Sequence, residues 1–537
     1  MTDQQRSLQH FPEKWVREYL PNYSFFLDNG VNFVNNICNT SPCGPSRASL
    51  FTGLYPAKNG ITGNMGTVLP EDMNFTRVLI DAGYDIFYKG KLHMNEDFTS
   101  FSTTWPEDPA TAPKMAEGED LIIEKLYGIQ GWTSPDFGTS LVRDNPTSNE
   151  IANLAGGSGH NDSRVVTGEY QTYKTQESVL EFLARVQKTP PDKPFCLVVS
   201  LLNPHDVSLY PNGWQQAGYQ NALFDHYEDF MLPESYYLDD LSTKPRAQAA
   251  YLNVGCGGKL EGSAALSYVK FYAYLHTLSD RLHSTIFDAI GDDLRKNSYI
   301  IRMADHGEMG MAHGGLQEKT YTAYNETLKV PMIWYHEGLV GGEREEMVSL
   351  IDMVPTLGKL AGADLSKYPQ LQGNDYSALL TSAENSEKVF DSVLFYGPGQ
   401  APGSSGGAAP DPSLPYPSSS TETNPNNAPY FAPSPLIPKG NQMSDYPDNI
   451  YAIVTRKGYK YAVYYALNAS DNTVDWSGAQ FELYDLNNDK NEINNLLPLN
   501  QLVSDKVIRL KEELHKELTE LLTKNDILPA GWNQGDF

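Results

Sequence analysis

The segment Ser41-Pro-Cys-Gly-Pro-Ser-Arg-Ala-Ser-Leu-Phe-Thr-Gly53 carries more information about this chain than any other stretch of similar length. Cys43 stands two residues before Pro45, and proline is favoured in the first turn of a helix, where no N–H is needed. The free N–H groups and the positive end of such a helix attract anions, and Arg47 adds donors suited to a tetrahedral oxyanion. The segment therefore predicts a reactive cysteine beside an anion site, with an ordinary cysteine in a Pro-rich turn as the alternative.

The order of residues in this segment resembles the signature of the type I sulfatases. The matching positions are Cys43, Gly44, Pro45, Ser46, Arg47, Leu50, Thr52 and Gly53. In that family a maturation enzyme oxidises the cysteine to formylglycine, and the hydrated aldehyde attacks the sulfur of a small anionic sulfate ester. The resemblance thus implies hydrolysis of sulfate esters by a nucleophile derived from Cys43.

Four further segments are similar to sulfatase motifs. They are Thr2-Asp-Gln-Gln5, Lys89-Gly-Lys-Leu-His93, Asn203-Pro-His205 and Asp305-His-Gly-Glu308, the last followed by His313, Gly314 and Lys319. Taken singly, these residues have ordinary alternatives. Asp3 could be a disordered terminal carboxylate, Lys91 and His93 a solvated lysine and a surface histidine, and His205 a loop-packing histidine.

The N-terminal motif departs from the usual pattern in two ways. Sulfatases usually open with a buried apolar strand that runs into the Thr-Asp motif, and here that strand is expected to be missing. Gln4 stands where many sulfatases have a second Asp. Relatives with Asp-Gln at this place often have Asp-His at the second site, as at Asp305 and His306, so the change is interpreted as a recognised variant.

The resemblance implies one divalent cation and a set of ligands for it. These ligands are Asp3, Gln4, Cys43 in its oxidised form, Asp305 and His306. Carboxylate and imidazole ligands suit calcium, which is the first candidate, and also magnesium or manganese. Together with Arg47, the cation would orient the nucleophile and lower its pKa.

The same resemblance implies roles for the remaining residues. Lys91 and Lys319 would stabilise the charge on the sulfuryl oxygens, each well-placed donor contributing on the order of 3–4 kcal/mol. His205, with Lys319, would act as the acid for the leaving oxygen. His93 would take a proton so that sulfate is expelled and the aldehyde reforms. The role of His313 stays open.

Apolar segments that alternate with helical patterns predict an α/β fold. The resemblance implies the alkaline phosphatase-like arrangement, a large mixed and mostly parallel sheet flanked by helices. Strands are expected at residues 84–88, 194–202 and 298–303, each directly before one of the motifs. Because ligands gather at the carboxyl ends of parallel strands, we expect the motifs to meet at one edge of the sheet.

The chain is expected to divide into three parts. Residues 1–397 form the catalytic domain, in which the stretch 95–165 shows little periodicity and predicts a long insertion. Residues 398–442 are dense in Gly, Pro and Ser and predict a linker or insert without its own core. Residues 443–537 predict a small α+β subdomain with antiparallel strands and a helix at 504–522.

The composition limits the partners. The 537 residues include 67 acidic and 40 basic side chains, a formal net charge of −27, which disfavours nucleic acid and anionic membranes. An anionic substrate therefore needs a local positive site. The four cysteines are too few for a disulfide-stabilised fold, and no apolar run is long enough to span a membrane. The absence of an apolar signal region favours a cytoplasmic protein as written, whereas a missing upstream segment would leave a periplasmic or secreted location open.

Two other functions are compatible with the same residues. Phosphonate and phosphate esters are tetrahedral anions like sulfate esters, so a phosphonate or phosphate ester hydrolase of the same superfamily is the first alternative. A non-catalytic relative that binds anionic ligands is the second. It requires that Cys43 stays a thiol and that the missing strand abolishes cation binding.

Overall fold

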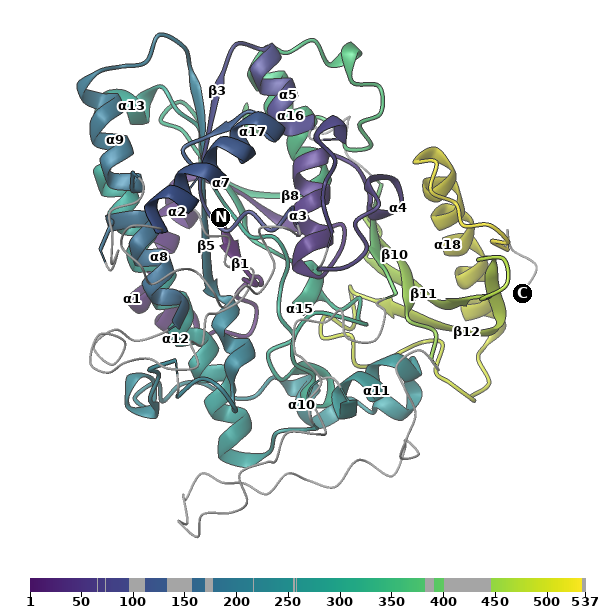
Figure 1. Ribbon diagram of the computed structural model, residues 1–537. Coiled ribbons are helices and arrows are strands. Elements are labelled where there is room, and N and C mark those ends of the chain that lie inside the picture. The colour runs from purple at the N-terminus through teal and green to yellow at the C-terminus, as the bar shows by residue number, and fades with distance from the viewer. Residues whose placement is uncertain are drawn as a thin grey trace.

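Two four-stranded sheets meet at the centre of the molecule (Figure 1). The first has the strand order β1–β5–β3–β4, and all its pairs are parallel. The second has the order β6–β7–β2–β8, in which β7 runs antiparallel to both neighbours and β2 pairs with β8 in parallel. A parallel bridge between Thr2 and Ala304 connects the two sheets. The expected mixed, mostly parallel α/β sheet is confirmed.

The structure is a computed structural model of the chain. It describes residues 1–64, 66–72, 74–95, 112–132, 157–169, 177–215, 217–254, 256, 258–381, 391–399 and 446–533. The strands of the two central sheets are β1 (Thr2–Asp3), β2 (Val31–Ile37), β3 (Asp85–Gly90), β4 (Ile129–Gln130), β5 (Phe195–Pro204), β6 (Ile300–Met303), β7 (Met332–Tyr335) and β8 (Gly342–Ser349).

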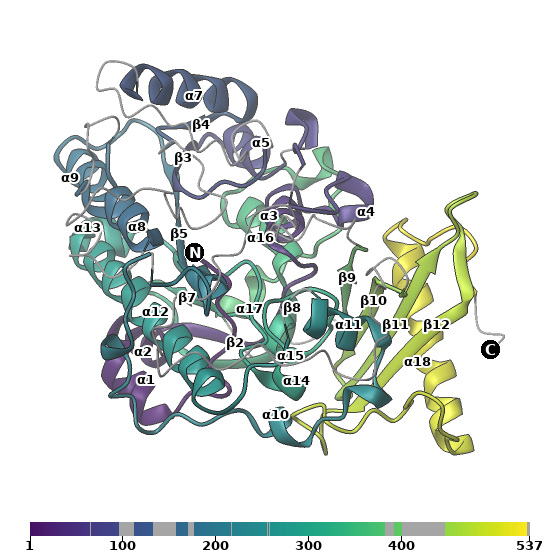
Figure 2. The same ribbon diagram turned by 60° about the horizontal axis from the view of Figure 1, so that its bottom comes forward.

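Helices flank the central sheet and cover an apolar core on each side. The helices are α1 (Glu13–Tyr19), α2 (Pro21–Asn29), α3 (Cys43–Thr52), α4 (Pro56–Asn59), α5 (Asn74–Asp81), α7 (Ala112–Tyr127), α8 (Gly157–Thr167), α9 (Val179–Lys188), α10 (Glu234–Leu238), α11 (Arg246–Val254), α12 (Gly262–Ala289), α13 (Asp292–Lys296), α14 (Ala312–Gly315), α15 (Asn325–Leu328), α16 (Met353–Leu360), α17 (Ser377–Thr381) and α18 (Asp505–Lys524). One core includes residues of α3, α5 and α16, and the other is built around α1, α2 and α12 (Figures 1 and 2).

The three strands expected before the motifs are confirmed as β3, β5 and β6. Strands β3 and β5 pair in parallel, so that Lys91 and His205 follow strands whose carboxyl ends face the same way. Asp305 follows β6, and the bridge between Thr2 and Ala304 brings it beside Asp3. The motifs therefore meet at one edge of the sheet, as expected.

The first strand is short rather than missing. Thr2 and Asp3 form β1, which pairs in parallel with β5. The pairing continues through Met1, whose carbonyl oxygen accepts from the N–H of Leu201 at 3.0 Å. Because the backbone groups of β5 need partners when buried, even two residues in this position are held as a strand. This corrects the expectation of an absent strand.

The expected insertion 95–165 contains regular structure. Its described parts include α7, β4 and most of α8, and β4 extends the parallel sheet beside β3. In α7 the buried pair Ile123 and Tyr127 has the i, i+4 spacing of a helix face. Leu121 and Ile122 beside this pair are exposed, which weakens the periodicity of the sequence, and the insertion has regular elements that the sequence did not predict.

The C-terminal subdomain is an antiparallel sheet covered by α18 (Figure 2). Its strands are β9 (Ser392–Gly397), β10 (Asn449–Thr455), β11 (Tyr459–Leu467) and β12 (Val474–Asp485), in the order β12–β11–β10–β9. Strand β9 pairs with β10 along its whole length, so the subdomain takes its edge strand from the part assigned to the catalytic domain. Residues 400–445, nearly all of the expected linker 398–442, lie outside the described residues.

None of the helices in the described part of the chain combines the length and the apolar character that crossing a membrane requires.

Candidate active site and metal centre

Cys43 is the first residue of α3 and is buried, with 1% of its surface exposed. Gly44 lets this first turn pack against the loop that follows α4, because a Cβ at position 44 would lie 2.7 Å from the carbonyl oxygen of Gly63. The N–H of Gly44 donates to Asn64 Oδ1 at 3.0 Å. The prediction that Cys43 stands at a helix N-terminus is confirmed.

Three residues from distant parts of the chain, Asp3, Asp305 and His306, converge on Cys43. Ligand atoms of Asp3, Cys43, Asp305 and His306 all lie within 4.8 Å of one another, and all four residues are buried. The sulfur of Cys43 is 3.0 Å from His306 Nε2 and 3.6 Å from Asp3 Oδ1. Two carboxylates, an imidazole nitrogen and an atom of residue 43 form a donor set that fits a divalent cation.

The orientation of His306 suits a metal ligand. Its Nδ1 lies 3.0 Å from the carbonyl oxygen of Gly307, an acceptor, so Nδ1 carries the hydrogen and Nε2 directs its lone pair to the cluster. Burial lowers the pKa of His306, but Asp305 and the sulfur of Cys43 together raise it to about 9 in the absence of a cation. A bound cation would take the place of the proton that His306 Nε2 carries at neutral pH.

Arg47 is directed at the carboxylates rather than at open space. It is fully buried, and its Nε donates to Asp305 Oδ2 at 2.9 Å while NH2 donates to Asp3 Oδ2 at 3.3 Å. NH1 donates to the carbonyl oxygen of Lys91 and to Ser200 Oγ. These contacts supply acceptors for the buried guanidinium, and the expectation that Arg47 also serves a tetrahedral oxyanion stays a prediction.

Lys91 follows β3 and pairs with Asp3. Its ammonium contacts Asp3 Oδ2, and both side chains are buried. Burial raises the pKa of Asp3, but the positive charges of Lys91 and Arg47 hold it well below its usual range. Asp3 is thus a buried, ionised carboxylate. The alternative that it is a disordered terminal residue does not fit this burial.

His93 reaches the first turn of α3 through Asn64. Its Nε2 lies 3.0 Å from the carbonyl oxygen of Asn64, whose side chain accepts from Gly44. Burial, assisted by the charges of Lys91 and Arg47, lowers the pKa of His93 well below its usual range. His93 is therefore neutral and able to accept a proton. Sequence reasoning gave no role to Asn64, whose only signal is its place in a Gly-rich turn.

His205 lies at the carboxyl end of β5, in a short 3-10 helix at His205–Leu209. It is 6% exposed, and its Nδ1 has no hydrogen-bond partner among the described residues. Burial lowers its pKa well below its usual range, as do Lys91 and Lys319, while Asp3 opposes the shift. A buried ring nitrogen without a partner fits a group that contacts substrate.

Lys319 joins the site through Gln4. Its Nζ donates to Gln4 Oε1 at 2.6 Å and to Glu318 Oε2 at 2.8 Å. The backbone N–H of Gln4 donates to Asp305 Oδ1 at 3.1 Å, so Gln4 lies next to the cluster. Its side-chain amide contacts Lys319 and the carboxylate of Glu308, and its place among the metal ligands stays a prediction.

His313 belongs to a different buried cluster. Its Nδ1 lies 2.6 Å from Asp239 Oδ2 and its Nε2 lies 3.4 Å from Glu326 Oε2. The ring stacks on Tyr324 with centroids 3.5 Å apart. Burial lowers its pKa, but Glu326 and Asp239 raise it to about 9. His313 anchors the loop that joins His306 to Lys319, which answers the question that the sequence left open.

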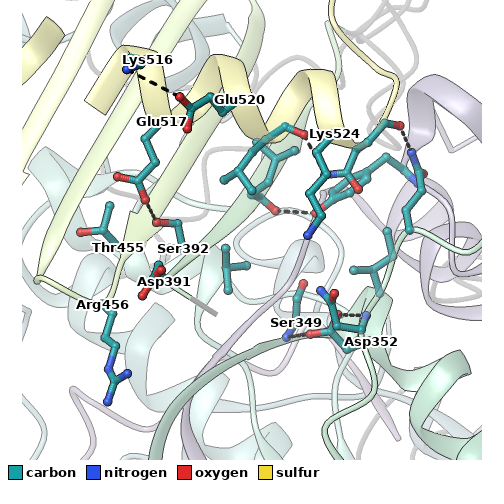
Figure 3. Close-up of a pocket in the computed structure, with 18 of the residues that line it drawn as sticks. Ser349, Asp352, Asp391, Ser392, Thr455, Arg456, Lys516, Glu517, Glu520 and Lys524 are labelled. Atoms are coloured by element: carbon teal, nitrogen blue, oxygen red, sulfur yellow. Dashed lines mark hydrogen bonds and ion pairs between the residues drawn. The ribbon is translucent and has the colours of Figure 1, made fainter. Parts of the chain in front are cut away.

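A separate cleft of about 830 Å³ lies between α18 and the loops of the main unit (Figure 3). None of the predicted site residues lines it. Asp352 accepts from the N–H groups of Ser349 and Asn374, and Ser392 donates to Glu517. The cleft thus lies apart from the residues that the sequence motifs bring together.

Comparison with known proteins gives a family and a set of relatives. Residues 3–363 match the family model described as Sulfatase. The chain is 24% identical over 371 residues to an ulvan-active sulfatase of Formosa agariphila, covering 68% of this chain and 60% of that protein. It is 28% identical over 360 residues to the uncharacterized sulfatase YidJ of Escherichia coli, covering 65% and 64%. The match thus spans less than two thirds of the length of these relatives.

Solved structures of similar fold extend over nearly the whole chain. A putative sulfatase from Bacteroides thetaiotaomicron has a TM-score of 0.63 at 15% identity, covering 98% of this chain and 91% of that one. A phosphonate monoester hydrolase from Silicibacter pomeroyi has a TM-score of 0.62 at 16% identity, covering 98% and 94%. At these identities the likeness shows the fold alone.

Proposed function

Because this chain belongs to the sulfatase family, we propose that it hydrolyses small anionic sulfate esters with a nucleophile derived from Cys43 and one divalent cation. The observation that carries the proposal is the convergence of Cys43, Asp3, Asp305 and His306 within 4.8 Å in a buried cluster. Burying two carboxylates beside a thiol costs free energy that packing alone does not repay. An oxidised residue 43 beside a cation gives each of these groups a function.

The nucleophile needs a change at Cys43 before it can act. We infer that a maturation enzyme oxidises the thiol to formylglycine, whose hydrate supplies the attacking hydroxyl. Residue 43 lies at the N-terminus of α3, where free N–H groups and the helix dipole favour a developing negative charge.

The cation site is made by Asp3, Asp305 and His306, with Gln4 as a further candidate ligand. When bound, a divalent cation lowers the pKa of the nucleophilic hydroxyl and offsets the two carboxylates. Calcium suits the oxygen ligands, and magnesium or manganese suits the Asp/His set as well. Arg47 holds Asp3 and Asp305 in place from the opposite side of the cluster.

Three further groups handle charge and protons. Burial lowers the pKa of Lys319 and Glu318 raises it, the net effect being a rise, so Lys319 stays positive beside the developing charge of the leaving oxygen. His205 acts as the proton donor, because a bound anionic ester raises the pKa of a neighbouring imidazole. His93, held neutral by burial, accepts the proton when sulfate is expelled.

The test combines a chemical and a kinetic measurement. The protein is expressed with a formylglycine-generating enzyme, and mass spectrometry of the peptide containing Cys43 should show the loss of sulfur that oxidation to the aldehyde produces. The same preparation should hydrolyse 4-nitrophenyl sulfate, and a Cys43→Ala variant should not. An unmodified thiol in a preparation that still cleaves the ester would remove this mechanism.

A phosphonate or phosphate ester hydrolase is the second candidate, because a phosphonate monoester hydrolase is among the structures of similar fold. Sulfate, phosphate and phosphonate esters of 4-nitrophenol, assayed side by side, separate the two. If phosphonate esters are cleaved much faster than sulfate esters, the phosphonate hydrolase becomes the first candidate function and the sulfatase the second. A modified Cys43 without activity on any ester would favour a relative that only binds anions.

A further inference from the structure

Glu308 is a buried carboxylate to which the function above gives no role. Its side chain is fully buried, two residues beyond His306. Oε1 accepts from Tyr268 OH at 2.6 Å and from the N–H groups of Gly310 and Glu318 at 3.0 and 2.9 Å. Oε2 accepts from Nε2 of Gln4. In this arrangement all four partners donate, and Glu308 accepts with both of its oxygens.

Glu308 and Glu318 determine which way the Gln4 amide points. Nε2 of Gln4 donates to Glu308 Oε2 and, at 3.3 Å, to Glu318 Oε2. Oε1 accepts from Lys319 Nζ at 2.6 Å. Turning the amide over would set its oxygen against two carboxylates and its NH2 group against an ammonium. The two carboxylates therefore fix the carbonyl end of Gln4 toward Lys319.

Gln4 in turn fixes the ammonium of Lys319. Two of the three N–H groups of Lys319 are used, by Gln4 Oε1 and by Glu318 Oε2. An ammonium held at two corners has a defined direction for its third N–H, which is then available to an oxygen of the substrate. Without the Gln4 contact the lysine keeps one partner and gains rotational freedom.

We propose that Glu308 is a positioning residue, which sets the orientation of the Gln4 amide and through it the direction of the Lys319 ammonium. This inference rests on the proposed function, in which Lys319 serves the leaving oxygen. It assigns Glu308 no contact with the substrate.

The first variant replaces the acceptor Oε2 of Glu308 with an NH2 group, which donates. In Glu308→Gln, the amide keeps its oxygen toward the three donors at Oε1 and presents NH2 to the NH2 of Gln4. The clash of two donors turns the Gln4 amide, and Lys319 loses its acceptor. Loss of such outer partners typically costs 10- to 100-fold, so we expect kcat for 4-nitrophenyl sulfate to fall by about 10- to 100-fold.

The second variant restores the complementarity. In Glu308→Gln with Gln4→Glu, the new amide donates to the new carboxylate, whose other oxygen accepts from Lys319. Because the new carboxylate also faces Glu318 Oε2, which Gln4 Nε2 contacts at 3.3 Å, we expect the double variant to recover part of the kcat and of the Tm that Glu308→Gln loses. Gln4→Glu alone should be impaired, because it puts a third carboxylate beside Glu308 and Glu318.

A matched control removes a partner of Glu308 without changing the amide of Gln4. Tyr268→Phe deletes the 2.6 Å donor to Oε1 but leaves a carboxylate at 308. It should lower Tm, yet leave kcat and KM within about twofold of the parent, since the Gln4 orientation is kept.

The outcomes separate the inference from the proposed function. A Glu308→Gln variant with lower Tm but unchanged kcat and KM, or a double variant no better than it, would overturn the positioning role. If the parent protein cleaves no ester, the proposed function fails. The Tm values of the two single variants and the double variant would then show whether residues 4 and 308 must be complementary.

Discussion

The buried guanidinium of Arg47 holds two carboxylates that would bind a cation. Its Nε and NH2 groups donate to Asp305 and Asp3, and all three side chains are fully buried. A lysine carries the same charge but has no planar fork, so it cannot contact both carboxylates and Ser200 together. Arg47 thereby acts on the metal site through its ligands.

Replacement of this arginine is the first prediction. In Arg47→Lys we expect cation affinity, measured by calorimetry, to fall by about 10- to 100-fold, the usual effect of losing a partner of metal ligands. Arg17→Lys is the control, because it makes the same substitution at a surface arginine, whose NH1 donates to both oxygens of Asp28. Equal affinities of the parent and Arg47→Lys would contradict the role assigned to the fork.

His313 gives a prediction about pH. Its folded pKa is raised from 6.5 to about 9, so the stability it contributes is fully present below pH 6.5 and is lost as pH rises through 9. This shift corresponds to an effect on the order of 3 kcal/mol. The Tm difference between the parent and His313→Gln should therefore be largest below pH 6.5 and shrink toward pH 9.

Thermal melts of both proteins between about pH 6 and pH 9 show whether the Tm difference falls or rises with pH. His226→Gln, which replaces an exposed histidine, should leave Tm unchanged at every pH. A His313→Gln difference that grew with pH would mean that His313 is neutral in the folded protein.

Helix α3 depends on a close contact at its first turn. A Cβ on residue 44 would lie 2.7 Å from the carbonyl oxygen of Gly63 and 3.0 Å from Asn64 Cα, both backbone atoms that cannot move alone. The same loop accepts hydrogen bonds from Gly44 and His93. The first turn of α3 and the His93 segment are thus held together by residues 63 and 64.

Gly44→Ala is expected to push this turn away from its loop. Because Cys43 and His93 both depend on the contact, we expect kcat to fall about 10-fold or more and Tm to fall as well, with a cost of about 1–3 kcal/mol for overpacking. Gly478→Ala is the control, since a Cβ there meets no atom within 4 Å. A Gly44→Ala enzyme with parental kcat would show that the loop adjusts freely.

The candidate metal site joins three distant segments of the chain. Its ligands come from residue 3, residue 43 and residues 305–306, which join β1, α3 and the loop after β6. A cation bound there stabilises the folded protein by the free energy of binding, about 2.7 kcal/mol at a concentration 100 times its Kd.

Chelation should therefore lower the Tm of the main unfolding transition, and added calcium should restore it. Asp305→Asn removes one charged ligand and should make Tm insensitive to calcium. Matched melts with magnesium and manganese identify the preferred ion, which gives the largest shift at equal concentration. A parent protein whose Tm ignores all three ions would exclude a structural cation at this site.

Local sequence was sufficient for the elements that carry the site. The Cys-x-Pro start of α3, the apolar runs of β3, β5 and β6, and the motif at the end of each are short-range signals, because a helix start and a buried strand depend on neighbouring residues. The helices α7 and α8 lack such a signal. In α7 the exposed Leu121 and Ile122 obscure the helical period, and α8 has few apolar residues. The pairing of β9 with β10 joins residues about 50 or more positions apart, and such a long-range contact has no local signal in the sequence.

Only the tertiary structure decided what each polar group contacts. The sequence around Arg47 does not show whether it contacts a tetrahedral oxyanion of the substrate or two carboxylates of the protein. Likewise, the sequence around Gln4 does not show whether its amide contacts a cation or a lysine. The partners Asp305, Glu308 and Lys319 lie about 300 residues away from Gln4 in the chain. Hydrogen bonds between buried groups are fixed by packing, which brings distant donors and acceptors together where water cannot replace them.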